Sequence, residues 1–296
     1  MQRLVAVLLA TGAAAGGPVV VADDGPDGSA PRPQAPARTP ATQALPPANA
    51  PVPRTPAALA AALTATTRRL HDAVGRWNGA GTVPDDVTYL ALFHQRMLRA
   101  MAARRALGDA TLARLAPDVR GEAADTVVGR RHLAAIPRSP GRLPPVRVAA
   151  AAPAADLRRD YDEAQRRFGV HWSILAAVNF VESAFGRVRS ASEAGARGPM
   201  QFLPSTWRRY GMGGNIDDPH DAILAAANYL SRAGARRDIN RALFAYNHSM
   251  SYVQAIRRFA GRMRIDERTF LTYYAWQVFV RTPHGVRRLT GPGRDA

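Results

Sequence analysis

The segment at residues 170–186 combines helical periodicity with a single acidic residue. Its aliphatic side chains recur at spacings of three, which places them on one face of an α-helix, and they include Leu175, Val178 and Val181. Glu182 lies four residues after Val178, so a helix brings its carboxyl onto the same apolar face. The sequence therefore predicts a buried helix with one carboxyl on its hydrophobic side.

The carboxyl of Glu182 has two interpretations. Burial disfavours the charged form of a carboxyl and raises its pKa, and a carboxyl that stays protonated near neutral pH can serve as a general acid. Alternatively, the carboxylate pairs with an arginine at the end of the helix, Arg187 or Arg189. The position of Glu182 alone does not decide between the two.

Helix signals fill most of the remaining chain. Thr55 precedes Pro56, and Asp218 precedes Pro219. In both pairs the first residue can cap a helix and the proline suits its first turn. We predict helices that begin near residues 56, 84, 109, 119, 156, 170, 204, 218, 238, 249 and 266, the last ending near residue 280. No alternating strand pattern follows the first 22 residues. The predicted fold class is all-α, with two helical lobes around a cleft.

Residues 1–22 have the pattern of a secretory signal peptide. Arg3 precedes an apolar stretch over residues 4–15, and Val20 and Ala22 suit the last positions before a cleavage site. The apolar stretch is short for a membrane span, and a retained N-terminal membrane anchor is the alternative. A chain without cysteine is not a lipoprotein. We therefore predict a secreted or cell-envelope protein.

Two proline-rich stretches divide the rest of the chain. Residues 23–54 hold few large apolar side chains, which predicts a disordered linker. We predict a small helical domain over residues 55–137 and a second linker over residues 138–153. The domain that carries Glu182 is predicted over residues 154–290. The first domain shows no cluster of reactive side chains. We expect it to pack against the second domain or to bind a protein partner.

The formal net charge is +17, and all 40 basic residues are arginine. Such a charge attracts acidic wall polymers and anionic lipid headgroups. The chain has no basic run of five and no motif that interleaves arginines with aromatic residues, so no nucleic-acid partner is predicted. The absence of cysteine also excludes disulfides, thiolate metal sites and a cysteine nucleophile.

Four groups of residues follow one another from Glu182 onward. They are Glu182-Ser183-Ala184-Phe185, Ser192-x-x-Gly195-Ala196-x-Gly198-x-Met200-Gln201-x-x-Pro204, Asn228-Tyr229-Leu230 and Ala245-Tyr246-Asn247. Together they resemble the signature of the lytic transglycosylases of bacterial cell walls, over about residues 155–289. The resemblance implies a lysozyme-like architecture for the second domain, peptidoglycan glycan strands as the substrate, and no cofactor.

The resemblance also implies roles for single residues. Glu182 would protonate the bond between N-acetylmuramic acid and N-acetylglucosamine, and its carboxylate would then take the proton of the muramic C6 hydroxyl, which closes on C1 to give a 1,6-anhydro end. The implied substrate-binding residues are Ser192, Met200, Gln201, Tyr246 and Asn247. The Tyr246 hydroxyl would reach toward the catalytic carboxyl.

Plain structural roles are open for several of these residues. Ser192 could only shape a loop, Gln201 could only start a helix, and Tyr246 could be a core aromatic. The chain also departs from the family pattern: His248-Ser249 stands where Ala-Gly is common, and Leu203 stands where some members have methionine. These departures leave the subtype open.

Two other functions compete with lytic transglycosylation. A hydrolytic muramidase, or a chitinase-type enzyme, needs a carboxylate that activates water; the candidates by position are Glu193, Asp217, Asp218 and Asp221, the last two better explained as helix caps. A non-catalytic wall-binding protein would be expected to have lost the acid, which is present here.

The sequence contains little evidence on metal ions or protein partners. His71, His94 and His132 are isolated, so no metal site is predicted. Cell-wall or divisome proteins are candidate partners of the N-terminal helical domain.

Overall fold

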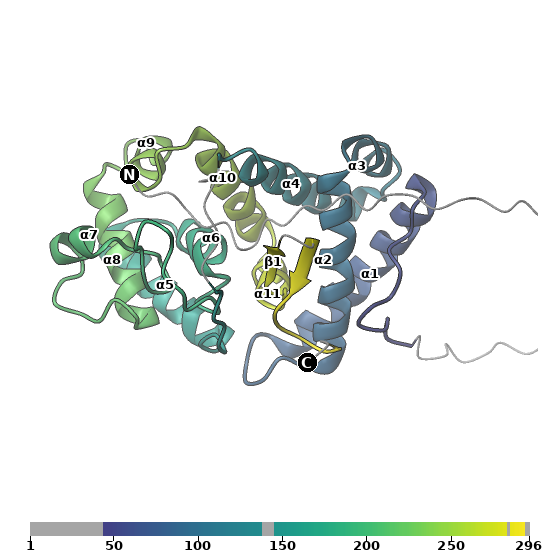
Figure 1. The fold of residues 1–296 in the computed structure, drawn as a ribbon, viewed down its shortest axis with the longest axis horizontal. Helices are drawn as coiled ribbons and strands as arrows, with labels where there is room; N and C mark the ends of the chain where they lie inside the picture. The colour runs from purple at the N-terminus through teal and green to yellow at the C-terminus, as the bar shows by residue number, and fades with distance from the viewer. Residues whose placement is uncertain (1–43, 138–144, 283–284, 294–296) are drawn as a thin grey trace, which may run out of the picture.

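The computed structural model describes residues 44–137, 145–282 and 285–293. Within these ranges the chain forms eleven helices followed by one β-hairpin (Figure 1). The helices are α1 Pro56–Trp77, α2 Asp85–Ala103, α3 Arg105–Leu112, α4 Pro117–Ala134, α5 Ala154–Phe168, α6 Trp172–Ser183, α7 Pro204–Tyr210, α8 Pro219–Arg232, α9 Ile239–Tyr246, α10 Met250–Ile265 and α11 Arg268–Tyr274. The predicted all-α class is confirmed. The predicted signal peptide lies outside the described residues.

Several helix starts follow directly from side-chain caps. The Thr55 hydroxyl accepts from the backbone N–H of Ala58 at the start of α1, and the Ser249 hydroxyl accepts from that of Tyr252 at the start of α10. Asp218 caps α8 and Asp238 caps α9 in the same way. Each cap satisfies a backbone N–H that has no partner inside its helix, so these four predicted starts agree with the structure.

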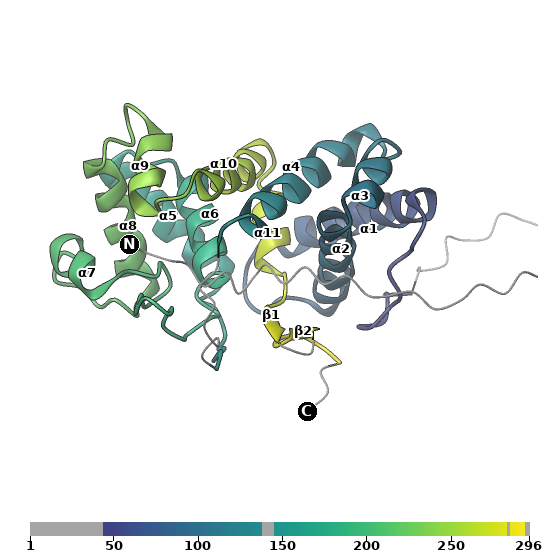
Figure 2. The same cartoon turned by 45° about the horizontal axis from the view of Figure 1, so that its top comes forward.

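The helices α1–α4 lie to one side of the molecule and α5–α9 to the other, with α10 and α11 between them (Figures 1 and 2). The main contact is between α4 and α10. Asp125 on α4 pairs with Arg258 at 2.8 Å and with Arg262 at 2.6 Å, and the Phe259 ring packs against the backbone of Gly129. One set of buried apolar side chains runs through both groups of helices. A boundary between independent domains at residues 138–153 therefore stays a prediction.

The last predicted helix is wrong over its second half. The chain leaves helical geometry after Tyr274 and forms strand β1, Phe279–Thr282, which pairs antiparallel with strand β2, Gly285–Arg288. The Gln95 side chain explains the change, because its amide donates to the Gln277 carbonyl at 2.8 Å and its oxygen accepts from the Gln277 N–H at 2.9 Å. These two bonds from α2 replace the helical hydrogen bonds of that residue.

The predicted disordered linker over residues 23–54 is wrong for its last part. Residues 44–54 lie against the helices, where Ala50 is buried and the Arg96 guanidinium donates to the carbonyls of Ala48 and Ala50. Arginine side chains on the helices donate hydrogen bonds to the backbone carbonyls of this segment. The segment has few apolar side chains, so its composition did not indicate that it is ordered. Residues 23–43 lie outside the described part.

The second predicted linker is also partly structured. Residues 138–144 lie outside the described ranges, but Val148 pairs with Val188 in an isolated antiparallel bridge, and the Tyr274 hydroxyl donates to the Ala152 carbonyl at 2.9 Å. In the described ranges, no helix combines the length and apolar character needed to cross a membrane.

Candidate active site

Helix α6 is buried along its whole length and ends in strained backbone. Every one of its residues, Trp172–Ser183, is buried. The chain then turns through three consecutive residues in the left-handed region, with φ 53° at Ala184, 62° at Phe185 and 80° at Gly186. Non-glycine residues adopt this region at a cost of about 1–2 kcal/mol each. The strain is held by aromatic packing, since Phe185 stacks on Phe180 with ring centroids 5.5 Å apart.

Glu182 lies in the last turn of this helix, and its residue surface is only 3% exposed. The Tyr252 hydroxyl on α10 donates to Glu182 Oε1 at 2.8 Å. Burial raises the pKa of Glu182 to about 8, while the hydrogen bond from Tyr252 acts in the opposite direction. Among the described residues, the other oxygen, Oε2, has no hydrogen-bond partner. The carboxyl is therefore protonated at neutral pH and keeps one oxygen uncommitted.

The competing interpretation of Glu182 as half of an ion pair is wrong. Arg187 donates to the Ala184 carbonyl and lies over the Tyr274 ring, with its guanidinium carbon 4.5 Å from the centroid. Arg189 donates to the Ala150 carbonyl. Both arginines at the end of α6 therefore bind backbone and aromatic groups, and neither neutralises the carboxyl.

Tyr246 does not make the contact that was predicted for it. Its hydroxyl donates to the Met200 carbonyl at 2.6 Å, and the tyrosine that binds the carboxyl is Tyr252, six residues further on. Burial, and after it the charge of the nearby Glu182, raises the pKa of the Tyr246 hydroxyl well above its usual value. The one sequence signal for Tyr252 is its place on the apolar stripe of α10 with Ile256 and Phe259, which predicts its burial but not its contact with Glu182.

The loop between α6 and α7 is shaped by its own hydrogen bonds. The Ser192 hydroxyl accepts from the Ala196 N–H at 3.0 Å, and the Ser192 N–H donates to the Ala196 carbonyl at 2.9 Å. Ser183, next to the acid, donates to the Pro199 carbonyl and accepts from the Gly186 N–H. Ser192 thus forms a loop turn, the plainer of its two predicted roles, while Ser183 ties the loop to the end of α6.

The remaining predicted site residues follow on this loop and on α9. Met200 is fully buried, and Gln201 has φ 49° with its side-chain amide donating to the Gly198 carbonyl at 3.0 Å. Asn247, the C-cap of α9, is also buried, and its side-chain nitrogen has no hydrogen-bond partner among the described residues. Of these three residues, Asn247 keeps a side-chain donor that the protein itself does not use.

None of the four candidate carboxylates for water activation is bonded to Glu182. Glu193 is exposed, Asp217 pairs with Arg197 at 2.9 Å, and Asp218 accepts from the Asp221 N–H. Asp221 in turn accepts from the Asn215 N–H at 2.8 Å. The predicted cap role of Asp218 is confirmed.

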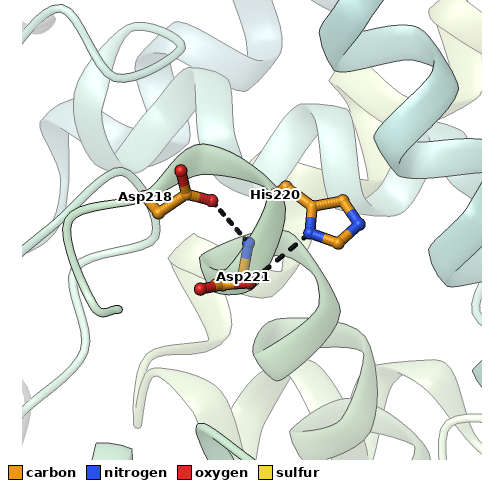
Figure 3. A group of neighbouring side chains, drawn as sticks. All are labelled: Asp218, His220 and Asp221. Atoms are coloured by element: carbon orange, nitrogen blue, oxygen red, sulfur yellow. Dashed lines mark hydrogen bonds and ion pairs between the residues drawn. The ribbon is translucent and has the colours of Figure 1, made fainter. Parts of the chain in front are cut away.

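Three potential metal ligands do cluster at the start of α8, in Asp218, His220 and Asp221 (Figure 3). One ligand atom from each lies within 4.8 Å of the others. Asp218 and Asp221 accept backbone hydrogen bonds, however, and His220 Nε2 lies 3.1 Å from the Glu163 carboxylate. The group therefore serves to start the helix and to attach it to α5.

Comparison with known proteins agrees with the predicted family. Residues 161–267 match the family model of the transglycosylase SLT domain. The membrane-bound lytic murein transglycosylase F of Thiobacillus denitrificans is 31% identical over 136 residues, which are 43% of this chain and 26% of that protein. The membrane-bound lytic murein transglycosylase F 1 of Alkalilimnicola ehrlichii is 31% identical over 148 residues, 44% of this chain and 29% of its own length.

No solved structure matches the chain. The chain spans less than a third of the length of the two curated relatives. The SLT match over residues 161–267 includes all the motifs around Glu182. The similarity to the transglycosylase SLT domain therefore covers residues 161–267, the part of the chain that holds Glu182.

Proposed function

We propose that this protein is a lytic transglycosylase that cleaves the β-1,4 bond between N-acetylmuramic acid and N-acetylglucosamine in peptidoglycan. The observation that carries the proposal is the state of Glu182, which is buried, has a pKa of about 8 and keeps Oε2 without a partner. A glycosidic bond needs a protonated acid at neutral pH, and this is one. The match to the SLT domain and the names of both relatives support the same substrate.

The reaction proceeds in two proton transfers through one residue. Glu182 donates its proton to the leaving oxygen of N-acetylglucosamine as the bond from muramic C1 to that oxygen breaks. The resulting carboxylate accepts the proton of the muramic C6 hydroxyl, whose oxygen forms a bond to C1. The product carries a 1,6-anhydro ring, no water is consumed, and Glu182 ends protonated as it began.

The neighbours of Glu182 divide this work. The Tyr252 hydroxyl binds Oε1, so the acidic proton resides on Oε2 and the carboxylate formed midway retains one donor. Since Oε2 is also closed off from solvent, the substrate must displace the side chains that cover it. Asn247 offers its unused amide to a sugar oxygen. We assign Ser192, Met200, Gln201 and Tyr246 to the same site from the sequence motif, and the Tyr246 hydroxyl holds the loop through the Met200 carbonyl.

Hydrolysis is less well supported. A water-activating carboxylate would have to face the sugar near Glu182, and each candidate is exposed or bonded elsewhere. We further propose that the protein acts at the cell envelope, and that helices α1–α4 support the catalytic helices or contact wall or divisome proteins.

The test is mass spectrometry of the fragments that the full chain releases from purified peptidoglycan. Fragments one water lighter than lysozyme products are expected, and reducing ends would replace the proposal with hydrolysis. Glu182→Gln should lower turnover by about a thousandfold, within the range of lost general acid–base catalysis. Glu193→Gln, which alters an exposed carboxylate, is the matched control and should leave turnover unchanged.

A further inference from the structure

A hollow lies at the opposite end of α6 from Glu182. It has a volume of about 340 Å³ and lies between three segments: the junction of α5 and α6, the loop between α8 and α9, and the second half of α10. Pockets that hold small ligands occupy about 300–1,000 Å³. At a rise of about 1.5 Å per residue, the eleven residues from His171 to Glu182 span about 16 Å of helix. A ligand here would not touch the catalytic carboxyl.

The charged residues around this hollow are all basic. Arg236, Arg257 and Arg264 line it together with His171, and no aspartate or glutamate is among its lining residues in the described part of the chain. The Arg236 guanidinium rests on Gly169, where an added Cβ would come within 2.4 Å of its Nε. Guanidinium groups thus lie on two walls of the pocket, one from the α8–α9 loop and two from α10.

Arginines on two faces of α10 differ in their partners. Arg258 and Arg262, on the face toward α4, both pair with Asp125. Arg257 and Arg264 face the pocket, and within the described ranges neither forms an ion pair or a hydrogen bond. All three arginines of the pocket are exposed, so water and salt screen much of their mutual repulsion. A bound anion would instead gain from the convergence of their positive charge on one hollow.

We propose that this pocket binds the phosphate group of a small phosphate ester. A carboxylate offers two oxygens, which a single guanidinium can occupy, whereas a phosphate offers three or four oxygens to several guanidinium groups at once. The volume exceeds what a phosphate ion alone would fill, which leaves room for the alcohol part of the ester.

The backbone of α6 adds little to this recognition. The N–H of Trp172 donates to Gln165, that of Ser173 to the His171 ring, and that of Ile174 to the His171 carbonyl. The first-turn N–H groups are therefore already used, and the helix contributes only its dipole. The arginine side chains supply the donors, so their replacement tests the proposal directly.

Titration calorimetry of the full chain should use sn-glycerol 3-phosphate, inorganic phosphate, and vesicles of phosphatidylglycerol or of phosphatidylcholine. Binding of glycerol 3-phosphate tighter than that of inorganic phosphate supports an enclosed ester site. Binding of inorganic phosphate with no gain from the glycerol part identifies an ion site only and overturns the ester assignment. Binding confined to the phosphatidylglycerol vesicles overturns the pocket in favour of a membrane-facing surface.

Two variants separate the pocket from general surface charge. Arg257→Gln should weaken glycerol 3-phosphate binding about tenfold or more, the loss typical of a charged hydrogen bond. Arg237→Gln removes the same charge next to Arg236 but outside the pocket lining, and should change binding by less than about twofold. Equal losses in both variants would contradict the proposal.

The sharpest variant leaves the charge untouched. Gly261 lines the pocket, and a Cβ there would meet no atom within 4 Å, so Gly261→Leu takes up part of the hollow and also favours the helix. Its thermal unfolding should match or exceed that of the natural protein while ester binding is weakened. Unchanged binding in this folded variant would overturn the proposal, and neither result depends on glycan cleavage.

Discussion

The Tyr252 hydroxyl donates to Oε1 of Glu182 across the interface between α10 and α6, at 2.8 Å. A hydrogen bond to the charged form of a carboxyl stabilises that form and lowers the pKa. Burial has the larger effect and keeps the pKa at about 8. Tyr252 is therefore a positioning residue that moderates the acid and fixes which of its oxygens carries the proton.

Replacing Tyr252 by phenylalanine should raise the pKa of Glu182 further, because the carboxylate loses its donor while burial remains. The alkaline limb of the pH–rate profile, which reports loss of the acidic proton, should move to higher pH. Turnover at neutral pH should fall about tenfold, since a weaker acid and an unsupported carboxylate both slow the reaction. The rate of peptidoglycan cleavage, measured from about pH 5 to about pH 10, reports the shift of this limb.

Tyr246→Phe is the control for this variant. It also removes one buried hydroxyl near the acid, but that hydroxyl binds the Met200 carbonyl. The control should lower stability and leave the alkaline limb in place. The same displacement of the limb in both variants would show that the effect comes from general disturbance of the site.

The sequence allowed the helix of Glu182, the burial of its carboxyl and the helix caps to be predicted, because periodicity and capping are local properties. It did not allow the choice between Tyr246 and Tyr252. Both tyrosines fall on apolar helix faces, and only the packing of α10 on α6 decides which hydroxyl reaches the acid. The end of the last helix and the strand that follows it within residues 275–282 could not be predicted either. They depend on a contact of Gln277 with Gln95, which is 182 residues away in the sequence.

Glu182 should make the folded protein less stable as the pH rises. Its folded pKa of about 8 lies above the ordinary glutamate value of 4.5, so the folded state holds a proton that the unfolded state releases. The favourable contribution is complete below about pH 4.5 and is lost as the pH rises through about 8. Glu182→Gln, which cannot ionise, should therefore gain stability relative to the natural protein over this interval, by on the order of a few kcal/mol.

The difference in the free energy of unfolding between the two proteins can be measured with denaturant at about pH 4.5 and about pH 8.5, which bracket the titration of Glu182. The relative stability of Glu182→Gln should be greater at the higher pH. Equal differences at the two pH values would mean that the carboxyl is solvated, and that its burial does not set its pKa.

Gly198 and Gly195 provide a matched pair in the loop that follows α6. Both adopt positive φ, 75° and 78°, but a Cβ on Gly198 would lie 1.9 Å from the Ile216 carbonyl oxygen, while one on Gly195 would meet nothing within 4 Å. Gly195→Ala should cost about 1 kcal/mol for the backbone alone. Gly198→Ala must also displace a backbone segment and should cost clearly more, as measured by urea unfolding. Similar costs would show that the loop yields freely.

Gln95→Ala tests whether the two groups of helices unfold together. It leaves the N–H and the carbonyl of Gln277 without their partners, which should cost about 2–4 kcal/mol for two buried polar groups. Gln254→Ala, at an exposed position of α10, is the control and should change stability by less than about 0.5 kcal/mol. Because the buried core runs from α1 to α11, circular dichroism and tryptophan fluorescence should follow a single transition in each protein. Two separate transitions in Gln95→Ala would instead support a real domain boundary at residues 138–153, with Gln95 joining two units that fold independently.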